Sequence, residues 1–166
     1  MKISVVLADV VRPNGPGAVT LNCLNAGWNL TMAQPVPEEH GTGYTLPPQA
    51  VAIFLEGSWD QLNRPLTMVL ELVDDEGQHA QLAVAPGQTQ HARIEHEMTI
   101  PSVPGAPNGT PGTATFMMEL GPTVLRIPVP RRRYIWRVSI DGAVGEAGFW
   151  VQAPQPTPPV IGRPAP

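Results

Sequence analysis

The segment Tyr134-Ile-Trp-Arg-Val-Ser-Ile-Asp-Gly142, followed by Gly145-Glu-Ala-Gly-Phe-Trp-Val151, predicts two β-strands joined by a tight turn. In the first segment, large apolar side chains occupy every second position and mostly polar ones lie between them. A period of two is typical of a half-buried strand in an antiparallel sheet. Asp141-Gly142 supplies the backbone angles that a two-residue hairpin turn requires. The sequence therefore predicts an all-β protein.

Similar short segments occur along most of the chain, separated by Gly, Pro, Asn and Asp. Besides residues 133–140 and 147–151, strands are predicted at residues 2–10, 18–24, 28–33, 50–56, 66–73, 79–85, 93–100, 113–120 and 123–129. Short strands with frequent turn signals favour an immunoglobulin-like antiparallel β-sandwich with Pro- and Gly-rich loops, here over residues 1–152. One helical turn is expected from Ser58 because Gln61 completes a capping box and Pro65 prevents extension.

Composition limits the classes of partner. With 166 residues the chain suits one domain, and its net charge of −4 provides no basic surface for a nucleic acid. No run approaches the roughly 18 apolar residues of a membrane span, so no membrane partner is expected. A single cysteine excludes an internal disulfide, and stability must come from packing.

Three segments lack strand signals and are the expected sites of contact with other proteins. Residues 34–49 and 101–112 are predicted to be long loops, and residues 153–166 an extended Pro-rich C-terminal arm. An arginine run precedes the final hairpin, and guanidinium groups pair well with carboxylates on a neighbouring protein. The candidate partner-binding residues are Tyr44, Leu46, Arg131, Arg132, Arg133, Val160, Ile161 and Arg163.

No group of residues predicts a catalytic, cofactor or metal site. In His91-Ala-Arg-Ile-Glu-His-Glu97, the two histidines point to opposite faces of a strand. We expect His96 to be a packed or interface residue and His91 to share a polar face with charged neighbours, with a metal site as the alternative. Cys23 is expected to be a buried small hydrophobe, and Asp74-Asp-Glu76 a charged hairpin tip rather than a calcium loop.

Several stretches carry a resemblance to a known family. They are Leu21-Asn-Cys-Leu-Asn-Ala-Gly-Trp28, Ala50-Val-Ala-Ile-Phe-Leu-Glu56, Trp59-Asp-Gln-Leu-Asn-Arg-Pro65, Leu70-Glu-Leu-Val-Asp-Asp-Glu-Gly77 and Tyr134–Gly142. Their order resembles a family of small β-sandwich proteins of actinobacteria and their phages, over roughly residues 1–152. The resemblance implies a structural fold and brings no catalytic residues. A Gly commonly precedes the equivalent of Tyr134 in that family, whereas this chain has Arg133.

These observations favour a non-catalytic structural protein over two alternatives. The leading hypothesis is a phage capsid decoration or minor virion protein at the capsid surface, which binds the major capsid protein, copies of itself, or both, through loops and the arm. The second is a carbohydrate- or protein-binding module of an actinobacterial cell, which would be cytoplasmic. The third is an enzyme with a metal at His91 or His96.

Overall fold

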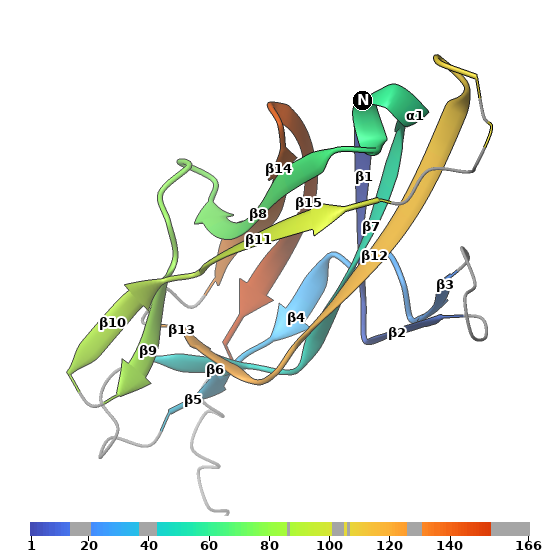
Figure 1. Cartoon of the computed structure of the whole chain (residues 1–166). Helices are drawn as coiled ribbons and strands as arrows, with labels where there is room; N and C mark the ends of the chain where they lie inside the picture. Colours follow the sequence, from blue (N-terminus) through green and yellow to red (C-terminus); the bar gives the residue numbers. More distant parts are fainter. Residues whose placement is uncertain are drawn as a thin grey trace, which may run out of the picture.

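The fold was examined in a computed structural model, which describes residues 1–13, 21–36, 43–85, 87–100, 105, 107–125 and 131–153. These residues form strands and one short helix, which confirms the predicted all-β fold. Two sheets enclose one hydrophobic core, and a third sheet lies at one end of them (Figure 1). The finer, immunoglobulin-like assignment stays a prediction.

The larger of the two core sheets, the main sheet, has the strand order β11-β8-β14-β15-β4. Its strands are β4 (Leu30–Met32), β8 (Pro65–Asp74), β11 (Arg93–Thr99), β14 (Arg131–Ile140) and β15 (Ala143–Gln152). The predicted hairpin is confirmed, because β14 and β15 pair over their whole length. Asp141 and Gly142 both have positive φ, at 47° and 82°, as a two-residue type I′ turn requires.

The opposing three-stranded sheet has the order β1-β7-β12, formed by β1 (Lys2–Ala8), β7 (Gln49–Ser58) and β12 (Pro111–Leu120). Alternate side chains of both sheets meet in the core, including Ile53 and Trp136. On one side of the sandwich, β1 lies close to β15. A Cβ added to Gly145 would lie only 2.6 Å from Cγ2 of Ile3, so a larger residue there would push the strands apart. On the other side, β11 and β12 are edge strands.

The third sheet, the end sheet, has the order β10-β9-β13-β6-β5. Its strands are β5 (Gln34–Pro35), β6 (Tyr44–Leu46), β9 (Gln81–Ala85), β10 (Gln88–His91) and β13 (Thr123–Leu125). Several of them continue a strand of the core sheets after a short break, as β13 continues β12 beyond Gly121-Pro122. The expected structureless connection over residues 34–49 is therefore wrong in part, since β5 and β6 pair within it.

A hairpin of β2 (Val10–Pro13) and β3 (Leu21–Leu24) packs on the outer face of the three-stranded sheet. Its Val11 buries Ala8, Ala50 and Ala52 in a small second cluster. Cys23 packs against this cluster but is only half-buried, so the prediction of a buried small hydrophobe is correct in part. The small alanine side chains let the hairpin approach the sheet closely at Val11. Cys23 lies at the margin of that contact.

The expected helical turn is α1 (Trp59–Leu62), where Oε1 of Gln61 accepts a hydrogen bond of 3.3 Å from the N–H of Ser58. Hydrogen bonds from Ser58 and from the N–H of Gly109 hold the pKa of Asp60 below its ordinary value. These contacts place the described end of the 101–112 connection beside α1. The residues that flank the other long connection lie at the opposite end, near β5 and β6 (Figure 1). The described residues of the two connections therefore lie at opposite ends of the sandwich.

Tyr134 gives the fold an expected sensitivity to alkaline pH. Its side chain lies in the core, where burial raises the pKa of the phenol to about 12. In the unfolded chain that pKa is about 10, so unfolding releases a proton between pH 10 and 12 and stability falls as pH rises through this window. Urea unfolding at pH 9, 10 and 11 measures the loss. Tyr134→Phe should show a flatter pH dependence, and an unchanged slope in the variant would contradict the assignment to Tyr134.

Candidate protein-binding face

An apolar patch lies where β4 pairs with β15 at the edge of the main sheet. Leu30, Met32 and Trp150 are 49%, 47% and 40% exposed. Trp150 is directly opposite Leu30 and Gln152 is opposite Met32, so the three apolar side chains lie on one face. Neighbouring Thr31 and Val151 point inward and are buried. We call Leu30, Met32 and Trp150, together with Arg133, the β4–β15 face.

Backbone hydrogen bonds to β15 fix this face at both ends of β4. The N–H of Trp150 donates to the carbonyl oxygen of Asn29 over 2.7 Å, and the N–H of Ala33 donates to that of Gln152 over 3.0 Å. The pairing is parallel, which joins segments more than a hundred residues apart in the sequence. Trp28 anchors the start of β4, since its indole contacts Phe149 edge-on at 5.5 Å. The apolar side chains are thus presented by rigid strands.

Arg133 adds a positive charge beside the apolar side chains. It is opposite Trp150 in the β14–β15 pairing, and its side chain is exposed. The guanidinium lies over Gly148, where an added Cβ would be 2.8 Å from Nη2. No carboxylate of the described residues forms an ion pair with Arg133, whereas Arg132 has three such partners. An apolar surface with a cation at its border suits an acidic-rimmed protein partner.

Arg132 forms ion pairs within its own chain, and its predicted role in partner binding stays a prediction. Its Nη2 donates to Oδ2 of Asp74 over 2.6 Å, and Asp75 and Glu76 lie within 4 Å. Asp74 is almost fully buried, and its Oδ1 accepts from the N–H groups of Glu76 and Gln78. The expected charged hairpin tip is therefore an anchored turn with a buried carboxylate.

Tyr44 and Leu46 do not lie at this face, whereas Arg131 pairs with Gln152 of β15 beside it. Leu46 is fully buried and Tyr44 is half-buried against the core, both in β6 of the end sheet. A partner could reach Leu46 only after β6 had moved. Arg131 is the first residue of β14. Val160, Ile161 and Arg163 lie outside the described residues, so their predicted role stays a prediction.

His79 lies beside charged side chains on the outer surface of the main sheet, and His91 of β10, in the end sheet, lies next to it. The ring of His91 is 5.1 Å from that of His79, whose Nδ1 lies 3.6 Å from Oε2 of Glu71. Arg137 joins Glu71 to Glu146, at 3.8 and 2.7 Å. In the part of the chain that the structure describes, no three acidic, histidine or cysteine side chains are grouped to hold a metal.

His96 is not packed, so of its two predicted roles only the interface role stays a prediction. It lies on the same side of the main sheet as the core residue Met68, its partner in the pairing of β11 with β8. Its side chain is nevertheless exposed, because β11 is the edge strand and no strand faces it there. The polar face predicted for His91 and its charged neighbours is correct in part. Arg93 and Glu95 of β11 share one face, where Arg93 donates a hydrogen bond of 2.8 Å to Glu95.

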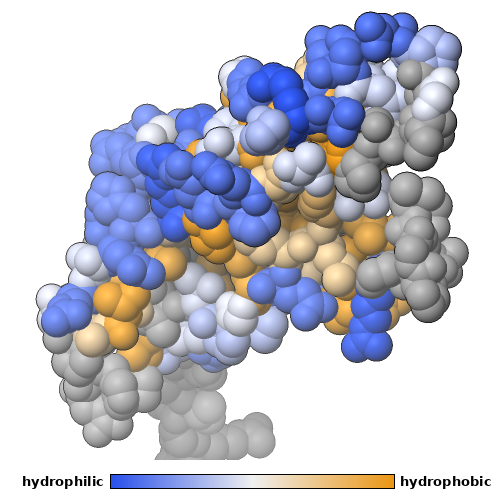
Figure 2. Space-filling view, viewed as in Figure 1, coloured by the Kyte–Doolittle hydropathy of each residue, from blue (hydrophilic) through white to orange (hydrophobic). Residues whose placement is uncertain are grey.

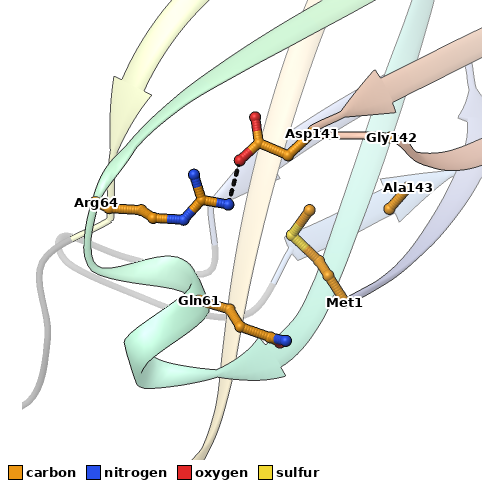
Figure 3. A pocket seen from close by; sticks show the side chains of 6 residues that line it. All are labelled: Met1, Gln61, Arg64, Asp141, Gly142 and Ala143. Atoms are coloured by element: carbon orange, nitrogen blue, oxygen red, sulfur yellow. Dashed lines mark ion pairs between the residues drawn. The ribbon is translucent and has the colours of Figure 1, made fainter.

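A separate hollow lies at the α1 end of the sandwich. Figure 3 shows Arg64 and Asp141 facing each other across it, with an ion pair of 2.5 Å, and Met1 and Gln61 beside them. The side chains that line it provide one carboxylate, one guanidinium and one amide. The ion pair ties the β14–β15 turn to the segment after α1, so we assign this hollow a structural role.

No protein-family model matches the chain, and no curated protein matches it. The β4–β15 face therefore has to be interpreted from its own residues. Sequence reasoning identified Arg133 but not the three apolar residues around it. The available signal was that Leu30, Met32 and Trp150 alternate along their strands with residues that are buried. This alternation shows that the three side chains point away from the core, but it does not show whether another part of the chain covers them.

In the described part of the chain, no helix combines the length and the apolar character needed to cross a membrane.

Proposed function

We propose that this chain is a non-catalytic structural protein that binds another protein through the β4–β15 face. The observation that carries the proposal is the exposed Trp150 beside Leu30 and Met32 on paired strands, with Arg133 at the border. Tryptophan and arginine are the residues that most often dominate binding energy at protein interfaces. Rigid presentation lowers the entropy lost on binding, which further favours a contact surface.

The specific form of the proposal is a phage decoration or minor virion protein that sits on the lattice of a major capsid protein. It is supported by the resemblance to β-sandwich proteins of actinobacteria and their phages, and by the Pro-rich composition of residues 153–166. On a lattice, many weak contacts would act together, so a small face on each copy would suffice. The corresponding location is the capsid surface.

Isolation from the native source under mild conditions tests this form. Co-migration with one abundant partner in a megadalton particle is the expected result, and recovery of the chain as a small free species would rule out the virion form.

Binding of the purified chain to that partner then tests the face. Trp150→Ser should weaken binding at least about tenfold, the effect of losing roughly 1.4 kcal/mol. Val84→Ser is the matched control, because Val84 is 51% exposed in the distant end sheet and should leave affinity unchanged. Equal affinity of the Trp150 variant and the wild type would overturn the role of this face.

A second candidate function is a carbohydrate- or protein-binding module of an actinobacterial cell, which would be cytoplasmic. The observation that favours its carbohydrate form is also Trp150, because an exposed indole can stack on a sugar ring. Titration with glycans and cell-wall fragments, followed by tryptophan fluorescence, separates the two candidates. A fluorescence change on adding a glycan that is lost in Trp150→Ser would support this second function. If no glycan changes the fluorescence, the protein is not a carbohydrate-binding module.

A further inference from the structure

The strand edges of this protein differ in how well they are protected against pairing with another chain. The unpaired backbone groups of an edge strand form a template for another strand unless charge, shortness or a covering segment prevents it. The edge strands β4, β5 and β10 have only three, two and four residues. β11 is longer but carries Arg93, Glu95 and Glu97, and β1 is approached closely by β15 at Gly145.

β12 lacks these protections. It has ten residues, forms the edge of the three-stranded sheet, and pairs only with β7 among the described strands. Glu119 is its single charged residue. Figure 2 shows largely apolar to neutral surface along the middle of β12, whereas the surface over β8 and β11 is mainly hydrophilic. A long and nearly uncharged edge is the kind that pairs with another strand.

The outer face of β12 carries both an apolar projection and an apolar hollow. Met117 is 42% exposed there. Four residues earlier on the same face, a largely apolar hollow of about 320 Å³ is lined by Thr113 and Thr115, together with Phe54 and Glu56 of β7 and Leu21 of β3. Projection and hollow therefore lie side by side on one strand, and neither fills the other.

From these features we propose that the protein forms a two-fold dimer in which β12 pairs antiparallel with β12 of a second copy. In the pairing that sets Met117 of one copy opposite Thr113 of the other, each Met117 enters the hollow of its neighbour. Directly opposite residues of antiparallel strands point to the same face, so this fit follows from the pairing. Both contacts form at once because a two-fold interface uses the same surface twice.

The charges are compatible with this pairing. Glu119 of one copy comes opposite Pro111 of the other, so no like charges face each other across the new strand pair. The three-stranded sheets of the two copies then form one six-stranded sheet. The β4–β15 face lies on the other sheet and stays accessible, so the dimer is independent of the proposed function and would present that face twice.

Sedimentation of the full chain over a series of concentrations tests the dimer. The wild type should change from monomer to dimer as concentration rises, and Met117→Glu should weaken the dimer at least about 100-fold because it places a carboxylate in a largely apolar hollow that already contains Glu56. Val144→Glu is the matched control: Val144 is 53% exposed on β15 of the other sheet, and its variant should dimerise like the wild type. Thermal unfolding verifies that both variants remain folded.

Cross-linking tests the pairing itself. In a Cys23→Ser background, chains with Thr113→Cys mixed with chains with Met117→Cys should form a disulfide-linked pair on oxidation. Met117→Cys alone should not, because its two copies would lie four residues apart along the strand, about 13 Å. A wild type that stays monomeric up to about 1 mM, where even weak complexes form, would overturn the proposal. So would a Met117→Glu variant that dimerises as strongly as the wild type.

Discussion

Replacing Trp136 by alanine is expected to unfold most of the protein at room temperature. The indole is buried at the centre of the main sheet, where Trp136 pairs with Leu72 of β8 and Ala147 of β15. Truncating such a side chain costs about 3–5 kcal/mol. Its Nε1–H also donates to Oε1 of buried Gln49 over 3.0 Å, and an orphaned acceptor adds about 1–3 kcal/mol. The total is comparable to the roughly 5–15 kcal/mol stability of a typical domain.

Urea unfolding followed by circular dichroism measures this effect. Trp136→Phe separates its two parts, since phenylalanine retains most of the packing but leaves Gln49 without its donor. That variant should be less damaging than alanine. Trp150→Ala is the matched control, because Trp150 is on the surface and its removal should cost little stability. A loss below about 1.5 kcal/mol for Trp136→Ala would show that the core does not depend on this side chain.

Asp74→Ala is expected to destabilise the protein by about 3 kcal/mol, because it leaves a partly buried cation and two N–H groups without their acceptor. The carboxylate receives hydrogen bonds from Arg132 at 2.6 Å, from Glu76 at 3.0 Å and from Gln78 at 2.8 Å. The same substitution should loosen the turn between β8 and β9. The free energy of unfolding and hydrogen exchange at the N–H of Gln78 report these two effects separately.

Two further variants show whether charge or turn geometry dominates at Asp74. Asp74→Asn keeps an oxygen for the turn but removes the ion pair with Arg132, so an intermediate loss of stability is expected. Asp75→Ala removes a carboxylate that is half-exposed and 3.8 Å from Arg132, and it should cost less than about 1 kcal/mol. Equal effects of Asp74→Ala and Asp75→Ala would contradict the central role of the buried carboxylate.

The elements that the sequence predicts well are those whose signals are local. The β14–β15 hairpin follows from alternation and from the Asp141-Gly142 turn, both of which lie within twenty residues. The helical turn α1 follows from Ser58 and Gln61, which are three residues apart. Trp136 is predicted to be a core residue because its apolar neighbours share its period. In each case the residues that determine the structure are close in sequence.

The β4–β15 face and the Arg132 ion pair could not be predicted in this way. Arg132 is 58 residues from Asp74 and meets it only because β14 pairs with β8. Trp150 meets Leu30 through a parallel pairing of distant segments, for which three-residue β4 gives no sequence signal. Leu46 looked like a loop residue between Pro-rich stretches, yet pairing with β13 draws β6 into the end sheet. Such outcomes depend on which distant strands become neighbours.

The central place of β14 in the main sheet has a consequence for synthesis of the protein in the cell. A nascent chain that ends before Arg131 already contains β7 and β8, but it lacks both Trp136 and Phe149. The three-stranded sheet is then opposed only by β8 and β11, because the core side chains of β14 and β15 are still missing. We therefore expect folding to finish only after β15 has left the ribosome, so that the growing chain needs protection by chaperones until that moment.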